Sequence, residues 1–584
     1  MAPRTYAVRR ALTHAIFFLS GSAGLIYEVV WSRLLKEVFG VTAYAVAAVL
    51  ATYLGGLALG AWALGGLVDR RARPLRFYGQ LEICIGVLAL LTAPLLRFFE
   101  PIDRLAATRL APDSFLLIAI RLALASLVIL PPTFVMGATL PAMTKAMVSR
   151  LGRLSRELAF LYALNTAGAV AGCLVAGALL IRTIGVHPSL WLAAALNFLV
   201  GAAALTLSRQ EAVAEPPEVS AGKAAGAQPG LLIAITLAGT ASLALEVIWT
   251  RVLVLVLGGS THAFVTMLAV FLFGIALGSF LLRLFVDRLR EPRRAFGYLQ
   301  AAIAISILAT IPAMSALVGA SQVWLYQLEL HWVQLLLGRF GIAAAIMIVP
   351  TTLIGMSFPL AARLYVGSVE KLGSGLGQVY GANTLGNIAG AVLGGFVLLP
   401  LVGMDRGLVL LTALNFAAAA WGFWPRERAG RWISGAAFGA AATAVVAMIA
   451  LWHPQPFRSI EEEPSDRTLF YEEGLVSTVK VLQRALDGEQ RVMLVDNVRI
   501  GQSSRGVDYK QQVLAHFPFL LVPRIERVLS IGLGTGIAAG EAARHPTVSR
   551  VDCVELSPSV IRGAQYFAPF NGDVLRNPKV RVIA

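Results

Sequence analysis

The chain has 584 residues, of which 57% are apolar and 14% are charged, and its mean hydropathy is +0.73. This composition is far more apolar than that of soluble domains, so it excludes a wholly soluble or disordered protein. A formal net charge of +16 could indicate nucleic-acid binding. The basic residues, however, lie in short clusters between apolar stretches. We therefore expect the lipid bilayer as a partner, and no nucleic acid.

Apolar stretches of the length of a membrane-spanning helix recur along the chain. Such a helix needs roughly 20 mostly apolar residues. We expect an uncleaved first helix after the basic N-terminus. The later stretches lie at 44–68, 83–96, 115–136, 157–181, 189–207, 231–249, 263–282, 339–362, 388–402 and 433–452. The sequence thus predicts a multi-pass protein of the cell (inner) membrane.

Clusters of arginine and lysine predict the orientation of these spans. Arg9 and Arg10 precede the first span, and other clusters lie at 70–76, 145–156, 283–294 and 426–431. By the positive-inside rule, loops rich in Lys and Arg stay in the cytoplasm, so these clusters and the N-terminus are expected there. About thirteen spans would then place the C-terminal segment outside, where adenosyl donors are scarce. The side of that segment stays open at this point.

A motif recurs within the apolar part. Residues 21–33, GSAGLIYEVVWSR, return at 239–251 as GTASLALEVIWTR, so that Glu246 of the second copy corresponds to Glu28 of the first. The same offset carries Asn165 onto Asn383, each beside glycines that suit close helix packing. Each copy contains about six spans, and an even number predicts parallel repeats.

Composition divides the chain into expected units. The fold class that we predict is an all-α polytopic membrane bundle, with two parallel six-helix repeats plus one helix. A small β-region and an incomplete Rossmann-like α/β domain follow it. The expected units are membrane repeat 1 at 1–208, a linker at 209–230, membrane repeat 2 at 231–428, an extra transmembrane helix at 429–455, the β-region at 456–526 and the partial nucleotide-binding domain at 527–584.

Two carboxylates lie in predicted spans. Glu28 and Glu246 occupy apolar helices, where a carboxylate is costly and is often functional. The interpretation that we favour is structural: an ion pair with Arg33 or Arg251 close to a helix end, near the membrane interface.

The C-terminal segment carries a candidate nucleotide site. Alternating apolar residues predict strands at 477–482 and 491–496. At 527–536, RVLSIGLGTG predicts a strand that runs into a glycine turn and then a helix near Ile537. A second strand ends in an acid about twenty residues further on, where a carboxylate can bind ribose. The candidate cofactor-binding residues are Gly532, Gly534, Gly536 and Glu555.

Metal chemistry is not expected. The chain has only three cysteines, Cys84, Cys173 and Cys553, and their spacing fits neither a zinc site nor a disulfide framework.

The chain resembles the fused major-facilitator/spermidine-synthase proteins, which are membrane-bound and polyamine aminopropyltransferase-like. The resemblance lies in LFYEEGLVSTV at 469–479, HFP at 516–518, the glycine turn and VELSP at 554–558, and the loop at 65–74 resembles the cytoplasmic loop motif of the major facilitators. It implies aminopropyl transfer from decarboxylated S-adenosylmethionine to a polyamine or other small amine, with Glu555 on the ribose.

On the amine side this sequence departs from the family pattern. Val479-Lys480 replaces a Tyr-Gln pair, 510–512 replaces a Tyr-His-Glu triplet, and Thr535 replaces an Asp in the turn. Losing a carboxylate weakens the attraction for a cationic amine, and Lys480 and Lys510 would add positive charge. S-adenosylmethionine itself thus stays open as co-substrate. The family's catalytic Asp is expected beyond Ala584, so the catalytic residues are unknown and we expect a C-terminally truncated chain.

Three functions remain open from the sequence. The favoured one is a membrane-bound aminopropyltransferase. The second is a transporter or sensor whose C-terminal domain binds a nucleoside without catalysis, and the third is an S-adenosylmethionine-dependent methyltransferase.

Overall fold

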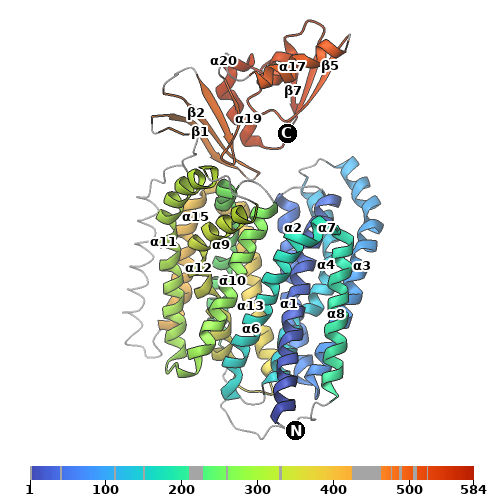
Figure 1. Ribbon diagram of the computed structural model, residues 1–584, viewed down its shortest axis with the longest axis vertical. Helices are drawn as coiled ribbons and strands as arrows, with labels where there is room; N and C mark the ends of the chain where they lie inside the picture. Colours follow the sequence, from blue (N-terminus) through green and yellow to red (C-terminus); the bar gives the residue numbers. More distant parts are fainter. Residues whose placement is uncertain are drawn as a thin grey trace.

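The computed structural model consists of a large helical part and a smaller C-terminal part (Figure 1). The helical part is all-α, whereas the C-terminal part mixes strands and short helices. The structure describes residues 3–39, 43–110, 114–148, 151–209, 228–257, 261–327, 332–423, 462–463, 465–474, 476–485, 490–503, 509–522 and 524–583.

Within these residues, twelve helical segments are long and apolar enough to cross a membrane. This agrees with a multi-pass membrane protein. The first six are formed by α1 (Pro3–Phe39), α2 (Ala43–Asp69), α3 (Pro74–Arg109), α4 (Phe115–Gly137) with α5 (Thr139–Met147), α6 (Leu151–Leu174) with η1 (Val175–Leu180) and α7 (Ile181–Thr183), and α8 (Val186–Ser208). The other six are formed by α9 (Pro229–Leu257), α10 (Thr261–Phe285) with η2 (Val286–Arg288), α11 (Pro292–Gln327), α12 (Trp332–Tyr365), α13 (Leu372–Val392) with η3 (Leu393–Leu398) and α14 (Leu399–Leu401), and α15 (Met404–Phe423).

Two of these spans lie outside the apolar stretches that the sequence analysis named. They are α11 and α15, and the spanning part of α15 has a mean hydropathy of only 1.3. Conversely, the predicted helix at 433–452 and nearly all of the predicted linker at 209–230 lie outside the described residues. Those two expectations remain predictions.

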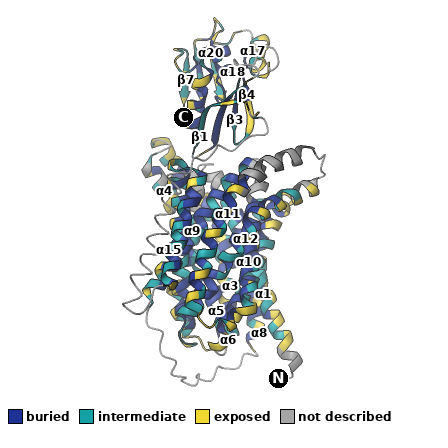
Figure 2. Cartoon of the chain, turned by 90° about the vertical axis from the view of Figure 1, so that its left-hand side faces the viewer, coloured by how far each residue is buried: buried dark blue, intermediate teal, exposed yellow. Residues whose placement is uncertain are grey.

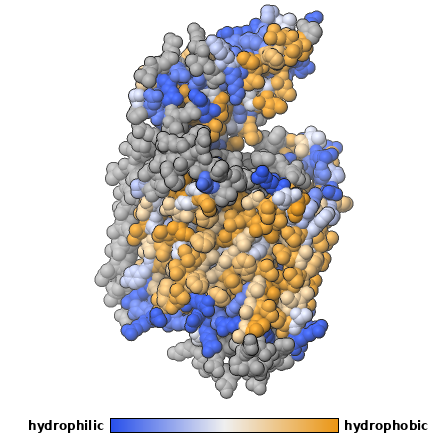
Figure 3. All heavy atoms as spheres, viewed as in Figure 1, coloured by the Kyte–Doolittle hydropathy of each residue, from blue (hydrophilic) through white to orange (hydrophobic). Residues whose placement is uncertain are grey.

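The outer surface of the helical part is apolar, as a lipid-facing surface must be. Figure 3 shows this orange band, with hydrophilic residues along the edge nearest the N-terminus. Among the exposed side chains are Trp62, Phe98 and Leu401, which are 64%, 71% and 77% exposed. In water such a surface would be costly, and in lipid it is not. Figure 2 shows that buried positions instead fill the inside of the bundle.

Glycines let neighbouring helices approach closely. A Cβ added to Gly60 of α2 would collide with the backbone carbonyl of Phe134 in α4. At Gly278 of α10 a Cβ would collide with the carbonyl of Thr352 in α12. Small residues at such crossings are typical of membrane helices, because close backbone approach replaces the hydrophobic driving force that lipid removes.

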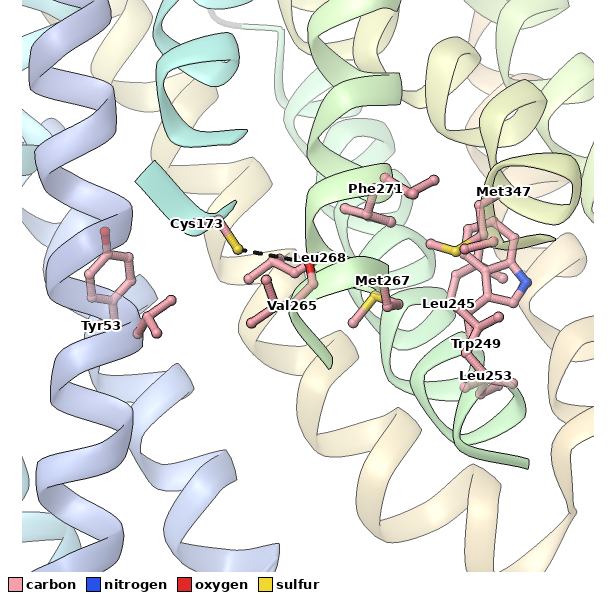
Figure 4. Packing of buried hydrophobic residues seen from close by; sticks show 14 of the residues in the cluster. Tyr53, Cys173, Leu245, Trp249, Leu253, Val265, Met267, Leu268, Phe271 and Met347 are labelled. Carbon is pink, nitrogen blue, oxygen red and sulfur yellow. Dashed lines mark hydrogen bonds between the residues drawn. The ribbon is translucent and has the colours of Figure 1, made fainter. Parts of the chain in front are cut away.

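Large side chains fill the space further from these crossings. Trp249 of α9 is fully buried, and its ring centroid lies 6.5 Å from that of Phe271 in α10. Leu245, Leu253 and Met347 lie around it (Figure 4). This cluster ties α9 to α10 and α12.

Contacts between distant segments bring the basic clusters within the described residues to one end of the bundle, while the cluster at 426–431 lies outside those residues. Arg10 of α1 pairs with Glu157 of α6 at 2.5 Å, and the guanidinium of Arg283 lies 3.8 Å from the ring centroid of Phe160. Lys145 donates to the backbone oxygen of Val68 at 2.9 Å. The N-terminus lies at this end, and the C-terminal part lies at the opposite end (Figure 1).

The C-terminal part contains two sheets. Strands β1 (Arg467–Glu473), β2 (Thr478–Gln483), β3 (Arg491–Val495) and β4 (Val498–Gln502) form an antiparallel sheet in that order. After α17 (Lys510–Leu521), the parallel strands β5 (Arg527–Ile531), β6 (Arg550–Val554) and β7 (Val580–Ile583) form the second sheet, with β6 in the centre. The helices α18 (Ile537–Ala543) and α19 (Pro558–Ala564) alternate with these strands, as in a Rossmann-like fold.

Arg251 joins the two parts. Its guanidinium, near the end of α9, donates to the backbone oxygens of Gly474 and Val476 at 2.5 and 3.0 Å and lies 3.9 Å from Asp496. From the other side, the Glu473 carboxylate accepts the backbone N–H of Met404 at 2.8 Å. The antiparallel sheet therefore rests on the ends of α9 and α15.

Candidate functional site

The glycine turn follows β5. Gly532, Gly534 and Gly536 all have positive φ, at 90°, 54° and 79°, in the region that favours glycine. At Gly536 an added Cβ would also lie 2.6 Å from a methyl carbon of Val574. Any other residue would be strained and crowded there. The turn thus presents bare backbone at the carboxyl end of a parallel strand, which is where ligands of open α/β sheets bind.

Glu555 directly follows β6 and contacts this turn. Its Oε2 accepts the backbone N–H of Leu533 at 2.9 Å, and its Oε1 accepts that of Ser557 at 3.0 Å. A carboxylate has about four lone-pair positions, so two remain for a ligand's hydroxyl groups. The structure therefore brings the predicted residues to one edge of the sheet. The free acceptor positions of this carboxylate suit a ribose, because the two O–H groups of a diol can both donate to one carboxylate.

Thr535 is a buried residue of the same turn. It is 1% exposed, and its Oγ1 donates to Oε1 of Gln511 at 2.6 Å. The Gln511 side chain also lies against Gly501 of β4. The antiparallel sheet, α17 and the glycine turn thus meet at this residue. The sequence analysis missed Gln511 as the partner of Thr535, and no local signal links positions so far apart.

The expectation that Lys480 adds positive charge to the site is wrong. Its Nζ pairs with Glu462 at 2.5 Å, and the two side chains are 6% and 9% exposed. A buried lysine needs such a partner, because an unpaired charge inside a protein is costly. Lys480 is therefore paired with a buried carboxylate and contributes no free positive charge to a ligand.

The HFP segment packs α17 onto α18. Nδ1 of His516 and Nε2 of His545 are 2.8 Å apart, and the ring of Phe519 stacks on His545 with centroids 3.5 Å apart. His516 also lies 3.4 Å from the Glu541 carboxylate. The HFP motif, which carries part of the resemblance, is thus in contact with Glu541 of α18 and with His545 just after it.

The ion-pair interpretation of the buried carboxylates is not supported. Arg251 binds the antiparallel sheet, as described above, instead of Glu246. Across the described residues, the structure gives neither the Glu28 nor the Glu246 carboxylate a hydrogen bond or ion pair. Both instead line a cavity inside the bundle.

Comparison with known proteins identifies relatives of the C-terminal part that contains the glycine turn and Glu555. Residues 507–584 match the spermine/spermidine synthase domain family. The C-terminal segment carries a spermidine synthase domain. A polyamine aminopropyltransferase 2 of Streptomyces coelicolor is 28% identical over 359 residues, which are 56% of this chain and 58% of that protein. This match is longer than the whole segment after residue 455, so it extends into the helical part.

Two further matches are about as long as the C-terminal part alone. Putrescine N-methyltransferase 2 of Nicotiana tabacum is 27% identical over 134 residues, 23% of this chain and 36% of that protein. A crystal structure of spermidine synthase in complex with the transition state analogue AdoDATO matches with a TM-score of 0.18 and 21% identity, and the match covers 20% of this chain and 39% of that one. The chain thus spans less than two thirds of the Streptomyces relative's length and far less of these two.

Proposed function

We propose that this protein is a membrane-bound transferase of the polyamine aminopropyltransferase type. The observation that carries the proposal is the Glu555 carboxylate, which two backbone N–H groups fix at the edge of a left-handed glycine turn. The match of 507–584 to the spermine/spermidine synthase domain and the similarity to an aminopropyltransferase support it.

In this proposal Glu555 accepts the ribose hydroxyls of decarboxylated S-adenosylmethionine. Gly532, Gly534 and Gly536 let the adenosyl part approach the backbone, since no side chain obstructs it. The acceptor is a polyamine or other small amine.

The membrane part of the proposal is a duplicated, major-facilitator-like bundle. Helix bounds support it, because they recur at the offset that separates Glu28 from Glu246: α3 begins at Pro74 and α11 at Pro292, while η1 begins at Val175 and η3 at Leu393. Each set contains six spanning segments. Two similar halves in the same orientation are what parallel repeats produce.

Full-length protein supplied with radiolabelled decarboxylated S-adenosylmethionine and putrescine tests the activity. We expect a labelled aminopropylated amine from the wild-type protein and at least a tenfold lower rate from Glu555→Gln, because the nucleoside loses an ionised acceptor. A Glu100→Gln variant, which alters an exposed ion pair on α3, should match the wild type. Labelled donor that stays unreacted with folded protein would contradict the proposal.

A methyltransferase is the second candidate. Two observations favour it: the similarity to putrescine N-methyltransferase, and Thr535 at the position where the resemblance expects an Asp. The same assay with S-adenosylmethionine labelled in its methyl group separates the two. A methylated amine, without an aminopropylated one, would support the methyltransferase.

A further inference from the structure

A cavity of about 270 Å³ lies inside the helical part. Its walls come from both halves of the chain, with residues of α1, α2 and α6 facing residues of α9, α10 and α13. The volume is much larger than the roughly 30 Å³ that one water molecule occupies in the liquid. It has the dimensions of a small organic molecule's site.

Two carboxylates face this cavity from equivalent positions. Glu28 lies on α1, and its counterpart in the second copy of the motif, Glu246, lies on α9. Neither side chain has a hydrogen bond or ion pair with any residue that the structure describes. Among these residues, the wall contains no lysine, arginine or histidine. Carboxylates within a membrane bundle are costly unless they have a partner, and they mark substrate or ion pathways.

The amides of the wall give an independent observation. Asn197 and Gln300 both line the cavity and are 2% and 0% exposed. Asn197 Oδ1 and Gln300 Oε1 have no hydrogen-bond partner among the described residues, whereas their nitrogens donate to Glu82 at 2.5 Å and to Ser357 at 3.0 Å. These two buried oxygens therefore lack a hydrogen-bond donor, although buried acceptors normally find a partner.

The tyrosines of the wall narrow the class of ligand. Tyr53, Tyr162 and Tyr380 line the same cavity. Aromatic faces attract organic cations, and two carboxylates with unpaired carbonyl oxygens accept the N–H groups of an ammonium. A bare metal ion would leave most of the volume empty. No group of three or more metal-type ligands occurs among the described residues.

We propose that this cavity is a binding site for an aliphatic diammonium ion, with one ammonium at Glu28 and the other at Glu246. The acceptors of Asn197 and Gln300 receive the remaining N–H groups. The proposal goes beyond the transferase activity and does not depend on it, because the cavity and the glycine turn are separate sites.

Binding of radiolabelled 1,5-diaminopentane to full-length protein in lipid nanodiscs, without nucleoside, tests the site. We expect saturable binding by the wild type. Each of Glu28→Gln and Glu246→Gln should weaken it about 10- to 100-fold, since each removes an ionised acceptor. The uncharged 1,5-pentanediol should not compete.

Glu100→Gln is the matched control, because this carboxylate also lies in the helical part but is partly exposed and is not part of the cavity wall. It should bind like the wild type. Size-exclusion chromatography and thermal unfolding show whether each variant is folded. Equal binding by the folded Glu28→Gln, Glu246→Gln double variant would overturn the proposal, and so would competition by the diol or an absence of binding. Loss of transferase activity alone would leave it standing.

Discussion

The Glu555 carboxylate is positioned before any ligand arrives. Leu533 and Ser557 each donate a backbone N–H to one of its oxygens. A ligand therefore meets an acceptor whose orientation requires no further loss of side-chain entropy. The entropic cost of forming these contacts then falls mainly on the ligand.

Replacing Glu555 by Gln should weaken binding of 5′-methylthioadenosine about 10- to 100-fold, because the amide has one acceptor oxygen and no charge. Titration calorimetry on the full-length protein measures this. Asp552→Asn is the matched control on the same strand, since Asp552 pairs with Arg550 at 2.7 Å outside the turn. An unchanged affinity in Glu555→Gln would remove this residue from the site.

Glu472 gives a prediction about pH. Hydrogen bonds from Arg562 hold the pKa of this carboxyl below its ordinary value, and the contact joins β1 to α19. A lowered pKa in the folded state means that the stabilisation is fully present above the ordinary pKa of about 4.3 and is lost as the pH falls through the folded value.

Glu472→Gln should therefore lower the stability of the C-terminal part by about 0.5–1 kcal/mol at neutral pH, a small amount because the pair is partly exposed. Thermal unfolding at pH 7 should show the difference, and the two proteins should converge as the pH is lowered below 4. A difference that grows in acid would contradict this assignment.

At the scale of elements, the local structure of the C-terminal part was largely predictable. Strands predicted at 477–482 and 491–496 correspond to β2 and β3, and the strand and helix predicted on either side of the glycine turn correspond to β5 and α18. Alternation and glycines act over a few residues, so they can be read directly. The contacts of Thr535 with Gln511 and of Arg251 with Asp496 join distant segments, and no local pattern encodes them.

For the membrane-spanning helices too, local sequence patterns predict the elements but not the contacts between them. Apolar stretches predicted most of these helices, whereas α15, with a mean hydropathy of 1.3, was not predicted. That Glu28 and Glu246 share one cavity depends on how two helices pack, which hydropathy does not report. The ion-pair interpretation failed for this reason: the neighbour of Arg251 in space is Gly474, which belongs to a distant segment of the chain.

One inter-helix contact at the N-terminal end of the bundle predicts a stability effect. The Asp69 carboxylate at the end of α2 accepts the backbone N–H groups of Gly373 and Ser374, at 2.6 and 2.8 Å. These belong to the first turn of α13, whose amides have no partner within the helix. Asp69 therefore caps a helix of the other half of the bundle.

Asp69→Ala should destabilise the helical part by about 1–2 kcal/mol, the usual cost of losing such a cap. Asp287→Ala is the matched control, because Asp287 is the equivalent residue of the second copy but is exposed. Thermal unfolding in one detergent compares the two variants. Equal melting temperatures would show that the contact contributes nothing to stability.

At the scale of the whole molecule, the arrangement of charge conflicts with a cytosolic transferase. The basic clusters that the structure describes share one end of the bundle with the N-terminus, and the spermidine synthase domain lies at the other end (Figure 1). The positive-inside rule assigns basic loops to the cytoplasm, so it places the domain on the opposite side of the membrane. A transferase there would take its adenosyl donor from outside the cytoplasm, or through the membrane part.

Cysteine labelling decides the orientation. In a Cys84→Ser background, Arg73→Cys marks the basic end and Arg576→Cys, whose side chain is 87% exposed, marks the domain. The other two cysteines, Cys173 and Cys553, are buried. A membrane-impermeant maleimide added to intact cells should label position 576, and position 73 only after permeabilisation, because the two lie on opposite sides of the bundle. Labelling of both positions from the same side would contradict the arrangement. Labelling of position 73 alone in intact cells would keep the arrangement, reverse its orientation and give the domain direct access to cytosolic adenosyl donors.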